Sequence, residues 1–256
     1  GWLYFTKEFF DLLYPSYGDT YPTYLGAIGM TYEQAGGGIA GLGILNSEGK
    51  NLTLVDRVRH NTVAGISTIE ISSANSKKLN EEFNKFFINN NNVNYIVNGD
   101  SDKINQLSEF LSKHKIDFYS PKVQKLSAFS YNKNKSVSYR TSSGDLVIPN
   151  YQAKAKLVDV LFERNTKLSD SITYDITAWS LPFVYGLNGF STENKVNVKE
   201  YIESKIENSL DKNAIAYAGV WNHMNDARFL SGLINNKIKV RYNAVSYTHL
   251  TLPTIP

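Results

Sequence analysis

Short apolar runs alternate with helical patterns from residue 94 onward, and this alternation constrains the fold more than any other feature. NYIVN at 94–98 reads as a strand, a helical pattern with Leu107 and Leu111 on one face follows, and IDFYS at 116–120 reads as a second strand. A strand–helix–strand unit of this length usually joins two parallel strands through a right-handed crossover. The pattern therefore predicts an α/β domain built on a doubly wound parallel sheet.

Further elements toward the C-terminus continue the same alternation. The predicted strands are 144–150, 214–221 and 238–245, the predicted helices are 153–163 and 226–236, and segment 125–140 has the alternating polar pattern of β-structure. The strand–helix–strand pattern of the first paragraph thus recurs near the end of the sequence. Such repetition indicates a fold and carries no information about chemistry.

The first 88 residues have a different rhythm. Residues 2–13 carry apolar side chains at helical spacing, the turn-rich loop YPSYGDTYPTY follows, and LGAIGMTYE at 25–33 reads as a short buried strand. Two helices are predicted after that, with Asn51 as the N-cap of the first. The residues that recur on one side of these helices are Leu54, Val55, Val58, Thr62, Ile66 and Ile69 in the first and Leu79, Phe83, Phe86 and Phe87 in the second.

The polar run INNNNVN at 88–94 separates the two halves, so we predict domains at 1–88 and 89–245. From residue 246 the sequence SYTHLTLPT closely resembles the translation of a transposase-based sequencing adapter, and residues 246–256 are left out of the fold prediction. The sequence also begins abruptly within an amphipathic segment. We expect it to be a piece of a longer protein.

Composition excludes several classes of function. The formal net charge is only +3 and the Lys and Arg residues are scattered, so no nucleic-acid-binding surface is expected. No stretch reaches the roughly 18 to 20 consecutive apolar residues of a membrane span. The chain has no cysteine, which excludes a thiol nucleophile and a cysteine-ligated metal.

The stretch YPSYGDTYPTYLGAIGMTYEQAGG at 14–37, followed by NLTLVDRVRHNTVAGI at 51–66, resembles the end of a known catalytic domain. It is similar to the C-terminal third of the zinc carboxypeptidases, family 14 of the metallopeptidases, in the form found in secreted bacterial proteins. The resemblance covers residues 1 to about 88. It implies a carboxypeptidase-like mixed sheet with helices in this region, and a secreted or periplasmic location.

In that family a strand of small residues ends in an aromatic residue and a glutamate, and a mobile tyrosine-bearing loop precedes it. The resemblance implies that Glu33 is the general base acting on zinc-bound water. It implies that Tyr14 donates a hydrogen bond to the peptide, with Tyr17 as the competing substrate-binding residue. From the residues alone, Glu33 reads as a turn cap or one half of a surface ion pair, and the tyrosines read equally well as residues that pack the loop on the core.

The zinc ligands implied by the resemblance are an H-x-x-E pair and a later histidine, and the sequence contains no such pair. In the family these ligands precede the base, so we expect Zn²⁺ to be held by residues upstream of residue 1 and the polypeptide alone to be inactive. His60 follows the base and is interpreted as a helix-face residue. His114 and His223 are interpreted as a helix end and a turn residue.

The second half, with GDLVIPNYQ and DSITYDITAWSLPFVYGLNGF, resembles the class I glutamine amidotransferase-like domain that follows the peptidase domain in some of these proteins. The resemblance implies a flavodoxin-like parallel sheet. Amidotransfer needs a cysteine nucleophile, so this domain is expected to lack that activity. Asp170, Asp175 and Trp179 are interpreted as a structural corner.

These features predict a fragment of a zinc-dependent hydrolase that cleaves peptide or amide bonds and has a peptide as its substrate. Two alternatives stay open. A pseudoenzyme without zinc ligands would bind peptides or glycans at a surface. A small-ligand-binding protein of the doubly wound type would use the loops GDSD at 99–102 and NHMND at 222–226, with Asp100 and Asp226 in the site.

Overall fold

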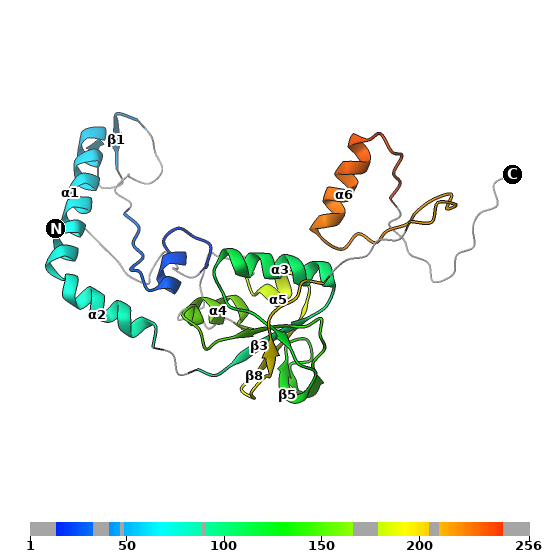
Figure 1. Ribbon diagram of the computed structural model, residues 1–256. Helices are drawn as coiled ribbons and strands as arrows, with labels where there is room; N and C mark the ends of the chain where they lie inside the picture. The colour runs from blue at the N-terminus through cyan, green and yellow to red at the C-terminus, as the bar shows by residue number, and fades with distance from the viewer. Residues whose placement is uncertain are drawn as a thin grey trace. The chain divides into compact units, whose positions relative to one another are not determined.

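The chain forms two compact units, Gly1–Glu203 and Ser204–Pro256. The structure, a computed structural model, describes residues 14–32, 41–46, 49–88, 91–165, 179–204 and 210–242. The predicted helix at 2–13 and residue Glu33 lie outside these ranges. The protein is a mixed α/β chain (Figure 1).

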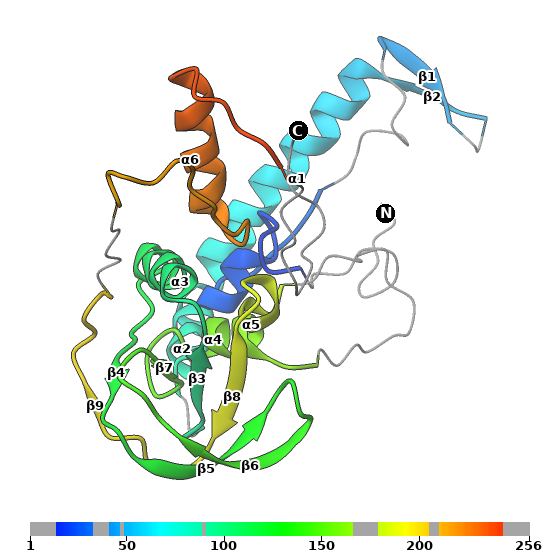
Figure 2. The same cartoon turned by 90° about the vertical axis from the view of Figure 1, so that its right-hand side faces the viewer.

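The first unit is built around a five-stranded sheet whose strand order is β6-β5-β8-β3-β7. Every neighbouring pair in this sheet is antiparallel. The strands are β3 (Asn94–Asn98), β5 (Lys125–Ser130), β6 (Lys135–Arg140), β7 (Leu146–Pro149) and β8 (Asn188–Thr192). Figure 2 shows the β5–β6 hairpin at one side of the sheet, away from the helices.

The predicted doubly wound parallel sheet is therefore wrong. Helix α3 (Ser101–Lys113) leaves β3 but does not return the chain to a parallel neighbour, because it leads to the short β4 (Ser120–Pro121). β4 pairs outside the main sheet with β9 (Val198–Lys199). The tight β5–β6 connection allows only antiparallel pairing, since a parallel return needs a crossover of a dozen or more residues. Periodicity identified the strands, but their direction depends on these connections.

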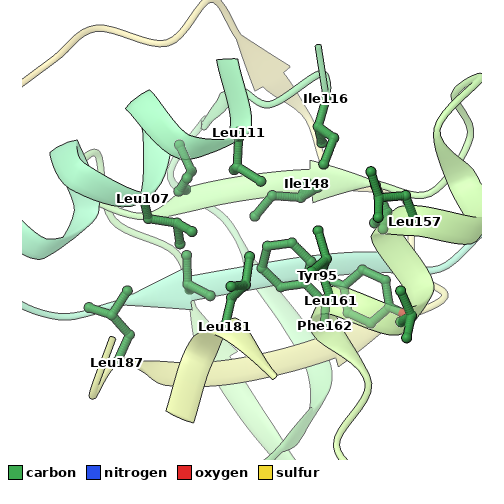
Figure 3. Packing of buried hydrophobic residues seen from close by; sticks show 14 of the residues in the cluster. Tyr95, Leu107, Leu111, Ile116, Ile148, Leu157, Leu161, Phe162, Leu181 and Leu187 are labelled. Carbon is green, nitrogen blue, oxygen red and sulfur yellow. The ribbon is translucent and has the colours of Figure 1, made fainter. Parts of the chain in front are cut away.

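Helices on one side of the sheet provide most of the core. Side chains from α3, α4 (Ala155–Phe162) and α5 (Leu181–Val184) pack on Tyr95 of β3 and Ile148 of the neighbouring β7 (Figure 3). Successive residues of a strand face opposite sides, so Ile96 lies in a second, smaller cluster on the other face. The larger cluster includes Leu107, Leu111, Leu157, Phe162 and Leu181.

The N-terminal part consists of η1 (Tyr21–Leu25), β1 (Gly43–Leu45), β2 (Asn51–Thr53), α1 (Leu54–Ala74) and α2 (Ser76–Phe86). The strand predicted over 25–33 is wrong within the described residues, because η1 occupies its start and 27–32 form no strand. Gly26 ends η1 with φ of 88°, a left-handed conformation that interrupts an extended run. Both predicted helices are confirmed as α1 and α2.

The cap of α1 is Thr53, two residues after the predicted Asn51. The Thr53 side chain accepts the Asp56 N–H at 3.1 Å, and the Asp56 carboxylate accepts the Thr53 N–H at 3.0 Å. This reciprocal capping box satisfies two N–H groups that the helix would otherwise leave open. Asn51 instead belongs to β2, which pairs with β1.

The second unit contains α6 (Met224–Asn235), which confirms the helix predicted there. The strand predicted at 214–221 is wrong, and so is the described part, 238–242, of the strand predicted at 238–245. Apolar side chains such as Ile215 and Trp221 are exposed in this unit. A strand needs a partner for its backbone groups, and no partner strand pairs with these segments among the residues that the structure describes.

Candidate functional site

Of the three predicted site residues, Glu33 lies outside the described ranges, whereas Tyr14 and Tyr17 lie in the turn at 14–20 that precedes η1. Both tyrosines are partly buried. The ring of Tyr14 meets Tyr17 edge-on, with centroids 5.1 Å apart, and meets Trp179 at 5.9 Å. The structure thus brings the two predicted tyrosines together with an aromatic residue interpreted from the sequence as structural.

The turn at 14–20 is attached to the segment that leads toward Glu33. The Thr31 hydroxyl donates to the Asp19 carboxylate at 2.5 Å, and this bond holds the pKa of Asp19 below its usual range. A Cβ on Gly29 would lie 2.0 Å from the Asp19 carbonyl oxygen, so only glycine lets the two backbones approach this closely. The tyrosine-bearing turn and residues 27–32 therefore form one local structure.

The same segment also contacts the two helices. The Tyr32 and Thr68 hydroxyls are hydrogen-bonded, which connects the segment to α1. Gly26, at the end of η1, lies where an added Cβ would be 3.0 Å from the Phe83 ring and 3.2 Å from the Phe86 ring of α2. Tyr32, the last described residue before Glu33, is thus hydrogen-bonded to α1, and Gly26 at the end of η1 packs on α2.

Helix η1 is attached to the α/β body, the name used here for residues 91–203. The Tyr21 hydroxyl is 2.8 Å from Nδ1 of His114, the C-cap of α3. Burial, and secondarily the charge of Lys154, lowers the pKa of His114. The neutral imidazole is thereby favoured, and its Nδ1 can accept the tyrosine proton when Nε2 carries the hydrogen. Tyr24 and Leu25 pack against the core of the body.

The described residues hold no group of three or more His, Asp or Glu side chains that could bind a metal ion. His60 lies on α1, His114 caps α3 and His223 caps α6, and they do not form a ligand set among the described ranges. The part of the chain that the structure describes therefore does not constitute a zinc site by itself.

The two aspartates of the alternative small-ligand site act as helix caps. Asp100 accepts the N–H groups of Asp102 at 3.0 Å and Lys103 at 3.3 Å at the start of α3. Asp226 accepts the N–H groups of Asn222 and His223, and these bonds lower its pKa. Both carboxylates are thus hydrogen-bonded to backbone N–H groups at the start of a helix.

Sequence reasoning missed a buried polar cluster centred on Asp145, whose side chain is fully buried at the start of β7. Its carboxylate accepts hydrogen bonds from Asn98 at 2.7 Å, Tyr139 at 2.7 Å, and both the hydroxyl and the N–H of Ser142 at 2.6 and 3.0 Å. Burial, and then Asp145 itself, raises the pKa of Tyr139. The only sequence signal was the Gly-Asp pair before β7, which is also an ordinary turn.

Comparison of the chain with protein-family models, with curated proteins and with solved structures finds no match. Among the described residues, none of the helices has the length and apolar character needed to cross a membrane. Function therefore has to be inferred from the residues and their contacts.

Proposed function

We propose that the chain is part of a zinc-dependent peptidase of the carboxypeptidase type, with Glu33 as general base and Tyr14 as a hydrogen-bond donor to the peptide. The observation that carries this proposal is the contact between the turn 14–20 and residues 27–32, made by Asp19, Thr31 and Gly29. A general base and an oxyanion donor have to be held in one site to act on one scissile bond. The sequence resemblance names these two segments, and the contacts among Asp19, Thr31 and Gly29 support assigning them to one site.

The proposed roles follow from the chemistry of the side chains. Bound zinc would lower the pKa of a water molecule and polarise the scissile carbonyl. Glu33 would take the proton of that water and deliver it to the leaving amine. Tyr14 would donate its phenolic O–H toward the oxygen on which negative charge develops. Tyr17, edge-on to Tyr14 at 5.1 Å, would contact the substrate beside it.

The exposed stripe of α1 also supports the proposal. Val55, Val58, Ile66 and Ile69 recur on one side of this helix and are exposed. A stripe of this kind normally faces a core. In a peptidase domain of which residues 1–88 form the last third, the preceding part of the fold would cover it.

The test uses the parent polypeptide containing this segment, loaded with zinc and assayed for release of the C-terminal residue from an N-blocked dipeptide. Glu33→Gln is expected to lower kcat by about 10²–10⁴-fold, the range for losing a general base. Glu81→Gln, on exposed α2, is the matched control and should leave kcat unchanged. Hydrolysis that survives Glu33→Gln would contradict the proposal. Peptide or glycan binding without zinc-dependent hydrolysis would favour the pseudoenzyme.

A further inference from the structure

The turn 14–20 and η1 meet the α/β body at three places. The Tyr14 ring packs on Trp179, the Tyr21 hydroxyl bonds to His114, and Tyr24 and Leu25 pack against the core. In both ribbon views the blue turn of η1 lies against α4 (Figures 1 and 2). The body therefore contacts the start of the tyrosine turn and the helix that follows it.

We propose that the α/β body is the platform that positions the tyrosine loop, with Trp179 and His114 as positioning residues. The platform's role in catalysis rests on the proposed function, whereas the anchoring of the loop does not. The α/β body would then contribute to function by holding the loop, without catalysing a reaction itself.

Trp179 packs against the core of the body. Trp179 lies just before Ser180, the N-cap of α5, and Leu181 and Pro182 of this helix are buried. α5 packs on both α4 and β8. The indole ring thus packs against the core and also contacts the Tyr14 ring, with the two rings inclined at 60°. Such edge-to-face packing favours one position of the tyrosine ring over others.

The His114 anchor fixes the other end of the turn. The His114 ring lies 4.4 Å from the Phe110 ring and 5.5 Å from the Tyr21 ring, between centroids, so it has little freedom to rotate. The hydrogen bond to the Tyr21 hydroxyl then ties the first residue of η1 to the end of α3.

Between the two anchors the backbone itself is bonded. The Tyr17 N–H donates to the Tyr14 carbonyl at 3.2 Å, and the Tyr21 N–H donates to the Tyr17 carbonyl at 2.9 Å. Asp19, between them, is held by Thr31. A loop ordered in this way before substrate arrives loses less conformational entropy on binding, which favours both binding and the transition state.

The first test measures anchoring in the chain itself and needs no activity. Trp2→Phe with Trp221→Phe leaves Trp179 as the only tryptophan. Adding Tyr14→Ala should shift the Trp179 emission to the red, because the indole loses a covering ring. Tyr151→Ala, which removes an exposed tyrosine from the same body, is the matched control and should not. An unchanged emission after Tyr14→Ala would overturn the Trp179 anchor.

Amide exchange tests the second anchor. Tyr21→Phe and His114→Gln should each speed exchange of the Tyr21, Thr23 and Gly26 amides about tenfold, since all three are hydrogen-bonded within the turn and η1. Tyr151→Phe is the control. Unaltered exchange in both variants would overturn the His114 anchor.

Kinetics of the zinc-loaded parent then test the catalytic consequence. Trp179→Ala should lower kcat/KM about tenfold and Trp179→Phe should restore most of it, whereas Trp221→Ala should have no effect. When Tyr14→Phe is already present, Trp179→Ala should lower kcat/KM much less than it does in the parent, because the two residues act through one loop. Equal losses in both backgrounds would overturn the positioning role. If Glu33→Gln keeps full activity while the emission and exchange changes occur, the proposed function fails and the anchoring stands.

Discussion

The α/β body and the pair α1–α2 are both rich in apolar residues, but only the body buries them. Among the described residues every buried hydrophobic side chain except Ile44 lies between Tyr95 and Val196. No residue of α1 or α2 is buried against the described part of the chain. The difference shows that an apolar stripe and good caps are enough to specify a helix, whereas a core requires segments distant in sequence to meet.

The exposed apolar stripe of α1 also indicates how much its burial would stabilise this helix. Fully burying a valine or isoleucine side chain is worth about 1.5–3 kcal/mol. Val55, Val58, Ile66 and Ile69 are all exposed, so covering this stripe would stabilise α1 substantially. The body already buries its apolar side chains and gains this stabilisation, whereas α1 does not. Four predictions test this difference between the two regions.

The largest expected effect comes from truncating the centre of the body. Phe162 is fully buried on α4, and its ring stacks on Tyr95 with centroids 5.5 Å apart. Phe162→Ala should lower the free energy of unfolding by about 3–5 kcal/mol, since it removes apolar contacts and leaves a cavity. Denaturant unfolding followed by near-ultraviolet circular dichroism measures it.

The matched truncation in the helix pair is Ile66→Ala on α1. Ile66 is 51% exposed, so its loss should change the free energy of unfolding by no more than about 0.5–1 kcal/mol. Comparable losses in the two variants would show that the α1 stripe is covered in solution and would remove the contrast.

Elements with strong local signals could be predicted from the sequence. α3, α4 and α6 follow clear helical spacing, and β7 is an apolar run between turn residues. Pairing could not be predicted, because the side-chain pattern of a strand is the same for either direction of its neighbour. The strand at 214–221 was predicted because it continued the strand–helix–strand pattern, and the structure forms no strand there.

The candidate site was predictable only where it rests on local sequence. Tyr14 and Tyr17 were named from the loop motif, and their partial burial is compatible with that role and with packing. Trp179 lies 165 positions after Tyr14, and nothing in the string around it indicates which residue it meets. His114 was interpreted as an exposed helix end, yet it is partly buried because η1 covers it.

The second prediction concerns polar groups in the body. Asp145→Ala leaves the Asn98 amide and the Tyr139 hydroxyl without their buried acceptor. We expect a loss of about 2–4 kcal/mol in the free energy of unfolding, since unpaired buried donors retain their full desolvation cost. Tyr139→Phe, which removes one donor and leaves the carboxylate three others, should cost about 1 kcal/mol. Chemical denaturation of both variants checks the order, and a larger cost for Tyr139→Phe would contradict it.

The third prediction is the counterpart in the helix pair, where the polar network is local. Thr53→Ala removes the cap of α1 and should cost about 1 kcal/mol of helix stability. Amide exchange in the first turn of α1 should quicken, while the amides of β3 and β7 stay as protected as before. Thr53→Ser keeps the hydroxyl and should restore protection. Faster exchange throughout the body would mean that α1 and the body unfold together.

The smallest expected effect is a dependence of the free energy of unfolding on pH that arises from His114 in the body. Burial, followed by the charge of Lys154, lowers the pKa of His114 in the folded protein from the usual value of about 6.5. The unfolded chain therefore binds a proton more readily than the folded one, and the free energy of unfolding falls as pH drops below about 6.5. Above that pH the imidazole is neutral in both states and contributes no slope.

His114→Gln should flatten this part of the pH profile of stability, measured by thermal unfolding at intervals between pH 7 and 5. Lys154→Gln should flatten it partly, because it removes the second cause of the shift. Tyr21→Phe removes the hydrogen bond but neither the helix that buries the ring nor the lysine, so its profile should keep its slope while lying lower at every pH. A slope lost in Tyr21→Phe and kept in Lys154→Gln would mean that the Tyr21 hydroxyl, rather than burial and charge, controls the proton on His114. The link between η1 and the body would then be the pH-sensitive element.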